Sequence, residues 1–228
     1  MNLREYSVFD IMGPIMIGPS SSHTAGAARI AKIARQIAGD DIKDVQFILY
    51  DSFASTFKGH GTDKALVAGI LGLDPDDDRL PHSFELAKEQ NISVSFIKSD
   101  KDAQNPNTVR IIIRDKSGDV TDILGSSIGG GNVVLKEING MNVEFTGEYE
   151  TLITKHVDKP GIIAMVTKVL AEYKINIAFM RVYRQLRGDN AIMVIESDQV
   201  IPEDVRISIE NINGIERAIV INSIKNTY

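Results

Sequence analysis

The chain of 228 residues contains no cysteine, and this absence excludes several kinds of chemistry. Without thiols there is no disulfide, no thiolate nucleophile and no cysteine-ligated zinc or iron–sulfur cluster on this chain. The histidines are also scattered, with no pair at the helical spacing of a metal site. They are His23, His60, His82 and His156. We therefore expect no metal on this chain, and an activity that needs a soft-metal cofactor requires a second chain.

Long hydrophobic runs and an excess of positive charge are absent as well. No apolar run approaches the roughly 18 residues that span a bilayer, and the first residues lack the apolar stretch of a signal peptide. The net charge is −6, whereas a nucleic-acid partner requires a clustered positive surface. We expect a cytoplasmic protein with no membrane partner and no nucleic-acid partner.

Residues 151–228 predict a domain of their own. The pattern indicates, in chain order, a strand at 151–157, a helix from 162, strands at 175–184 and 190–197, a helix from 202 and a strand at 215–222. The first helix carries an apolar face at helical spacing, formed by Ile162, Met165, Val166, Val169, Leu170 and Tyr173. The order βαββαβ predicts a ferredoxin-like fold with both helices on one face of the sheet.

Residues 1–147 predict an α+β domain in which the helices mostly come first and the strands later. We expect helices at 25–38, 62–73 and 84–90, and strands at 45–50, 92–98, 108–114, 120–128, 133–138 and 143–146. Ala27, Ile30, Ala34 and Ile37 share one face of the first helix. The boundary between the two domains falls near Gly147 to Glu150.

Gly18-Pro-Ser-Ser-Ser-His-Thr24 precedes the first helix and is the strongest candidate for function. One hydroxyl is enough to cap a helix, but three serines and a threonine surround His23 here. The surplus hydroxyls and the free amides of a helix start suit an anion such as a carboxylate or a phosphate. His23 adds a side chain that titrates near neutral pH. The alternative from the residues alone is a capping loop with an exposed histidine.

Three further segments are weaker candidates. Lys58-Gly-His-Gly-Thr-Asp-Lys64 leads into a helix that Thr62 or Asp63 would cap, and its glycines let the backbone approach a ligand closely. Asn105-Pro-Asn-Thr108 is typical of a turn whose side chains bond the backbone. Asp158-Lys-Pro-Gly161 lies where a strand enters a helix, so the helix-start amides are free for a small ligand's carboxylate; a plain βα turn is the alternative.

With these residues identified, the chain resembles the β subunit of bacterial iron–sulfur-dependent L-serine dehydratase. The resemblance rests on the segment from Ser7 to Arg29, on Lys58 to Ala65, on Pro106-Asn-Thr108 and on Ser127-Ile-Gly-Gly-Gly131. Residues 151–228 are similar to an ACT domain, a module that commonly binds amino acids. The first domain is also similar to the allosteric substrate-binding domain of some phosphoglycerate dehydrogenases.

The resemblance implies a reaction, a partner and a set of site residues. The reaction is the conversion of L-serine to pyruvate and ammonia, with a [4Fe–4S] cluster on a separate α subunit acting as Lewis acid while a base removes the α-proton. His23 and His60 are the implied acid–base groups. The implied substrate-binding residues are Ser20, Ser21, Ser22, Thr24 and Asn107. In the ACT domain, Asp158, Gly161 and Ile162 are implied to bind an effector, and a homodimer formed through this domain is left open.

A different class of function remains as the alternative. In that interpretation the chain is a non-catalytic, amino-acid-sensing regulatory subunit. The two histidine loops favour the catalytic interpretation, because a purely regulatory domain has no need of His23 and His60.

Overall fold

The computed structural model describes residues 14–184 and 186–224. The chain divides into two compact units, one ending at Lys136 and the other beginning at Glu137. A six-stranded sheet with strand order β2-β1-β3-β4-β5-β6 ends at Phe145, and the next strand, β7 (Glu150–Val157), belongs to a second sheet. The predicted boundary near 147–150 falls between these two strands and stays a prediction.

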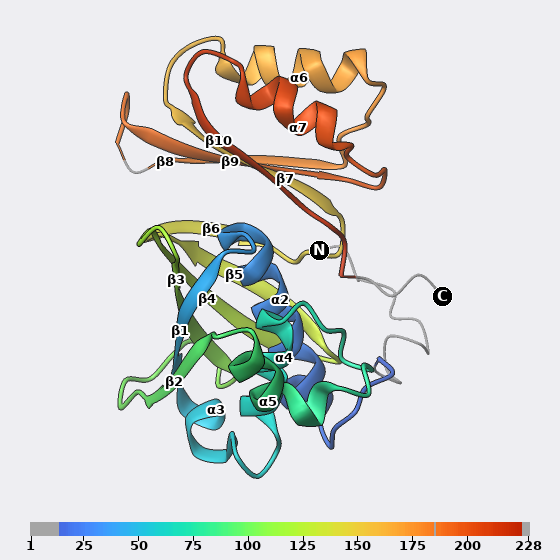
Figure 1. Ribbon diagram of the computed structural model, residues 1–228. Coiled ribbons are helices and arrows are strands. Elements are labelled where there is room, and N and C mark those ends of the chain that lie inside the picture. Colours follow the sequence, from blue (N-terminus) through green and yellow to red (C-terminus); the bar gives the residue numbers. More distant parts are fainter. Residues whose placement is uncertain (1–13, 185, 225–228) are drawn as a thin grey trace, which may run out of the picture. The chain divides into compact units, whose positions relative to one another are not determined.

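The first part of the chain alternates helices and strands before it becomes strand-rich (Figure 1). Its elements are η1 (Ser21–Gly26), α2 (Ala27–Ala38), β1 (Ile42–Leu49), α3 (Asp51–Thr56), α4 (Thr62–Ile70), η2 (Leu80–His82), α5 (Ser83–Glu89), β2 (Ser93–Lys98), β3 (Thr108–Asp115), β4 (Val120–Gly129), β5 (Asn132–Ile138) and β6 (Met141–Phe145). β1 pairs with β2 in parallel and with β3 antiparallel. The α+β class is confirmed.

One face of the sheet carries the core because its side chains alternate along the strands. Phe47 lies opposite Ile111, which lies opposite Ile123, and all three are fully buried. Helix α2 packs on β3 and β4 with the predicted face that contains Ile30. Its other side, with Ala28, is buried as well, because α4 packs there. Helix α2 is therefore enclosed between the sheet and α4, and its small residues allow α4 to approach closely.

Three local features differ from the sequence-based expectation. The helix predicted to begin at Ala25 is preceded by η1, a turn of π-helix that already includes His23. A short helix, α3, follows β1 where none was predicted. The N-cap of α4 is Gly61, in the left-handed conformation with φ of 68°, and no side chain caps this helix. The expected capping by Thr62 or Asp63 is therefore wrong.

The C-terminal part forms the predicted ferredoxin-like fold. Its elements are β7, α6 (Ile162–Glu172), β8 (Phe179–Arg184), β9 (Asn190–Ser197), α7 (Glu203–Glu210) and β10 (Ile215–Ile221). The strand order is β10-β7-β9-β8, with every neighbouring pair antiparallel. Both helices lie on one face of this sheet (Figure 1). Their buried residues, with Leu152 and Met193 of the sheet, form the core of this domain.

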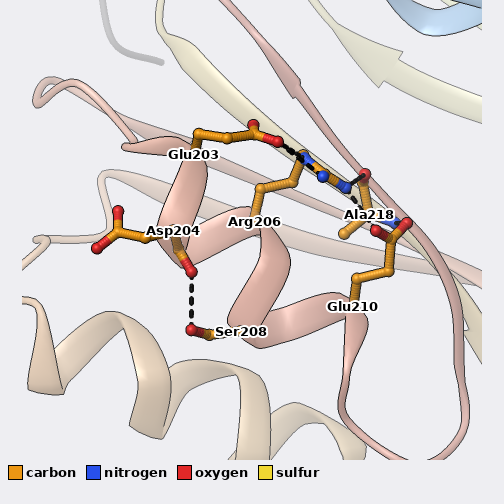
Figure 2. A network of polar contacts seen from close by, with 6 residues as sticks. All are labelled: Glu203, Asp204, Arg206, Ser208, Glu210 and Ala218. Carbon is orange, nitrogen blue, oxygen red and sulfur yellow. Dashed lines mark hydrogen bonds and ion pairs between the residues drawn. The ribbon is translucent and has the colours of Figure 1, made fainter.

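A charged network fixes α7 against β10 (Figure 2). Arg206 lies between Glu203, at 2.8 Å from its Nε, and Glu210, at 2.5 Å from its Nη1. The same guanidinium donates to the carbonyl of Ala218 at 3.3 Å, while the amide of Ala218 donates to Glu210 at 3.2 Å. Hydrogen bonds to both carboxylates raise the pKa of Arg206. The helix and strand are thus joined by charge-assisted hydrogen bonds as well as by apolar packing.

Candidate active site

The π-helical turn η1 places His23 inside the first unit rather than on an exposed loop. Ser20 is its N-cap, and the Ser20 hydroxyl accepts a hydrogen bond from the backbone N–H of His23 at 3.3 Å. The side chain of His23 is only 9% exposed. π-Helical turns are frequent at functional sites because their wider spacing displaces side chains from the regular helical positions. Ser20 therefore caps η1, as predicted for a serine of this segment, and the same turn buries His23.

The two histidine loops meet. The rings of His23 and His60 lie edge to face with centroids 4.8 Å apart, and the Phe53 ring lies 5.2 Å from His23. Ser52 Oγ lies 3.1 Å from Nε2 of His23, and Ser20 Oγ lies 3.4 Å from Nδ1. Burial, and then the positive charge that His60 can carry, lowers the pKa of His23. A lowered pKa keeps this imidazole neutral at neutral pH, which is the state a general base requires.

Several buried polar atoms near these loops have no hydrogen-bond partner among the described residues. They include Oγ1 of Thr24, Oγ1 of Thr62, Nδ1 of His60, Oδ1 of Asn107 and Oγ of Ser127. Native proteins pair most buried polar groups, so each unpaired group is costly unless a ligand or water satisfies it. Ser127 is packed closely on the π-helical turn, because a Cβ added to Gly26 would collide with its hydroxyl. The set offers donors and acceptors to a small polar ligand.

The turn at residues 105–107 connects the parts of this region. Asn107 donates from its amide to Asn105 at 2.9 Å, as predicted for an Asn-rich turn, and its carbonyl accepts from the amide of Ser127 at 2.9 Å. Pro106 accepts at its carbonyl from the amide of Ser52 at 2.9 Å. The turn thus connects the start of α3 to the end of β4. This places Asn107, a predicted substrate-binding residue, within a network that also holds Ser52.

The other predicted substrate-binding serines lie on the more accessible side of the turn. Ser21 and Ser22 are half-buried, whereas Thr24 is 1% exposed. Their predicted contact with substrate stays a prediction. Ser7 to Gly13, the first part of the resembling segment, lies outside the described residues. Sequence reasoning missed Ser52; the polar Asp51-Ser52 pair, one residue beyond the end of strand β1, was the available signal.

The predicted effector residues lie at the β7–α6 turn of the second unit. Gly161 has φ of 96° and is the N-cap of α6. Asp158 accepts at Oδ2 from Arg184 Nη1 and from the amide of Gly188, each at 3.1 Å, and these bonds lower the pKa of Asp158. Ile162 is 1% exposed and belongs to the core of this unit. Effector binding at this turn stays a prediction.

Within the described ranges, no group of three or more His, Asp or Glu side chains is arranged to hold a metal ion. No helix among the described residues is long and apolar enough to cross a membrane. The side chains described at the site are imidazoles, hydroxyls and a carboxamide.

Comparison with known proteins assigns both parts of the chain. Residues 7–87 match the serine dehydratase beta chain family, and residues 151–213 match the ACT domain family. The L-serine dehydratase beta chain of Peptoniphilus asaccharolyticus is 42% identical over 94% of this chain and 96% of its own length. A probable L-serine dehydratase beta chain of Bacillus subtilis is 42% identical over 89% of this chain and 92% of its own length.

A more distant relative has a different name. D-3-phosphoglycerate dehydrogenase of Methanocaldococcus jannaschii is 34% identical over 60% of this chain, but over only 26% of its own length. The two beta chains, by contrast, match this chain nearly from end to end, through both the domain with the histidine loops and the ACT domain. The chain belongs to the family of L-serine dehydratase beta chains.

Proposed function

We propose that this β subunit takes part in converting L-serine to pyruvate and ammonia, and that His23 and His60 are its acid–base groups. The observation that carries the proposal is the meeting of the two rings, 4.8 Å apart, from loops far apart in the sequence. The unpaired atoms of Thr24, Asn107 and Ser127 support a neighbouring pocket for a small polar substrate. Cytoplasmic localisation is part of the same proposal.

The residues of this chain do not fit an iron–sulfur cluster. Such clusters are held by thiolates, and the sequence has no cysteine. If the reaction uses a [4Fe–4S] cluster, a partner α subunit must carry it, and we assign it there. The name "beta chain" of the relatives supports the existence of such a partner.

The chemistry assigned to this chain is proton transfer and positioning. A neutral imidazole removes the α-proton of serine, the electron pair forms the Cα–Cβ double bond, and the hydroxyl takes a proton back from the imidazole pair and leaves as water. The resulting aminoacrylate hydrolyses to pyruvate and ammonia. Ser20, Ser21, Ser22, Thr24 and Asn107 are proposed to bind the substrate. The hydroxyls of Ser20 to Thr24, at the start of η1, suit its carboxylate.

The test is turnover of serine by the reconstituted pair of subunits. We expect His23→Ala and His60→Ala each to lower kcat by about a hundredfold or more, which is the usual contribution of a general acid or base. His82→Ala is the matched control, because His82 is exposed. Near-normal turnover in both loop variants would contradict the proposed roles. Serine deamination by this chain alone, without metal, would contradict the assignment of the cluster to a partner.

The ACT domain favours a second candidate, a non-catalytic subunit that senses an amino acid. The phosphoglycerate dehydrogenase relative supports this candidate, because the similar segment there is part of an enzyme that is not named a serine dehydratase. In that case His23→Ala and His60→Ala would leave the unregulated turnover unchanged and alter only its response to added amino acids. The same kinetic series therefore separates the two candidates.

A further inference from the structure

The His23 ring has a hydrogen-bonding neighbour at each nitrogen, and the closer one comes from a distant segment. Ser52 Oγ lies 3.1 Å from Nε2, compared with 3.4 Å between Ser20 Oγ and Nδ1. Packing against the rings of Phe53 and His60 restricts the plane of the imidazole. Packing does not distinguish a ring nitrogen from a ring carbon, however, so the hydroxyls must supply that distinction.

The backbone around Ser52 is held in an unusual conformation. Asp51 has φ of 42°, in the left-handed region that residues other than glycine rarely adopt. Its Oδ2 accepts from the amide of Ala103 at 2.9 Å, and the next amide, of Ser52, donates to Pro106 at 2.9 Å. Strained residues persist where the surrounding structure enforces them, often at functional sites. Here the strain immediately precedes the residue that contacts His23.

We propose that Ser52 is a positioning residue that fixes Nε2 of His23 and thereby holds the ring in one tautomer, edge to face with His60. A neutral imidazole has one donor nitrogen and one acceptor nitrogen. Ser20 Oγ already accepts from the backbone N–H of His23 at 3.3 Å, so its own hydrogen is directed to Nδ1, and Nε2–H then donates to Ser52 Oγ. The burial that lowers the pKa of His23 keeps the ring in the neutral state in which tautomers exist. The catalytic consequence rests on the acid–base role proposed for His23; the positioning itself does not.

The direct test is nitrogen NMR of the imidazole in the full chain, with ¹⁵N-labelled histidine, above neutral pH. His23→Gln identifies the signals of His23. We expect the Nδ1 and Nε2 signals to be widely separated in the wild type and to move toward each other in Ser52→Ala, because the tautomers then mix. Unchanged signals in Ser52→Ala would overturn the proposal.

Two variants make the comparison specific. Ser52→Thr keeps the hydroxyl and is expected to restore the separation of the two signals. Ser55→Ala is the matched control, because Ser55 is an exposed serine of the same helix whose hydroxyl donates to Asp51 instead. Signals that move toward each other in Ser55→Ala as much as in Ser52→Ala would overturn the proposal. If Ser52→Ala does not fold, Ser52→Cys, with a weaker hydrogen-bonding group, replaces it with the same expected direction.

Kinetics of the reconstituted pair separate this inference from the proposed function. We expect Ser52→Ala to lower kcat by about tenfold to a hundredfold, since a small misplacement of a catalytic group has effects of this size. KM for serine is expected to change much less. Mixed tautomers with unchanged turnover would confirm the Ser52 contact and contradict the acid–base role of His23.

Discussion

His156 shows what burial does to a histidine that has no assigned part in the chemistry. It is 2% exposed, and its Nδ1 lies 3.2 Å from Oγ1 of Thr154. Burial lowers the pKa of His156, although a hydrogen bond to the backbone of Thr154 and the negative charges of Asp158 and Glu216 oppose this effect. His156 is therefore favoured in its neutral form in the folded protein.

This lowered pKa predicts a pH dependence of stability. An unfolded histidine binds a proton near pH 6.5, whereas folded His156 resists it, so the unfolded state binds more protons as the pH falls. The free energy of unfolding should thus decrease as the pH drops below about 6.5. Urea denaturation at several pH values measures it. We expect this decrease to be smaller in His156→Asn than in the wild type, and as large in His82→Asn as in the wild type. Equal pH profiles for the wild type and both variants would refute the role of His156.

At the scale of elements, Gly69 sets the distance between α2 and α4. A Cβ at Gly69 would lie 2.7 Å from Cβ of Ala31 and would collide with the carbonyl of Ala28. The two helices therefore cross with backbone near backbone. Because η1 leads into α2 and the His60 loop leads into α4, this crossing also helps to bring the two histidines together.

We expect Gly69→Ala to destabilise the protein, although alanine is the better helix former by about 1 kcal/mol. Adding a group to a closely packed contact costs about 1 to 3 kcal/mol. Because the contact here is with backbone atoms, we expect this cost to exceed the gain in helix propensity. Denaturant unfolding gives the sign directly. Gly118→Ala is a useful comparison, since no atom lies within 4 Å of a Cβ there and only its φ of 97° opposes alanine. A Gly69→Ala protein as stable as the wild type would show that the helices separate without cost.

Hydrophobic periodicity predicted the longer elements but not the local features of the site. The helices at α2 and α4 and the whole βαββαβ order follow from repeating apolar positions. The six-residue helix α3 is too short for such a pattern, and the π-helical turn η1 has a different spacing. Of the predicted apolar face, Ile162, Val166 and Leu170 lie in the core, whereas Met165 and Tyr173 are 39% and 41% exposed.

The sequence also singled out the two histidine loops as candidates, but it did not predict that they meet. Both histidine motifs were recognisable from their glycines and hydroxyls. Ser52 was not, because its contact with His23 spans 29 residues and depends on the position of α3 after β1. Local patterns do not encode such a contact; it follows only from the folded sheet.

For the whole molecule, the two units each contain a separate candidate for binding an amino acid. In the first unit it is the group of unpaired polar atoms around His23 and His60. In the second it is the β7–α6 turn, where Gly161 has φ of 96° and open space at its Cβ position. Because the candidates lie on different units, single substitutions should separate them.

Calorimetric titration of the full chain with L-serine distinguishes the two sites. If the ACT turn is the effector site, as the resemblance implies, binding heat is retained in His23→Ala and lost in Gly161→Ala, since alanine is strained at this φ. The converse pattern would place serine binding in the first unit and leave the ACT turn without this ligand. Absence of heat in the wild-type chain would contradict serine binding by either unit outside the assembled enzyme. The regulatory role that the resemblance implies for the ACT domain can therefore be tested at a turn that is altered without changing the histidine pair.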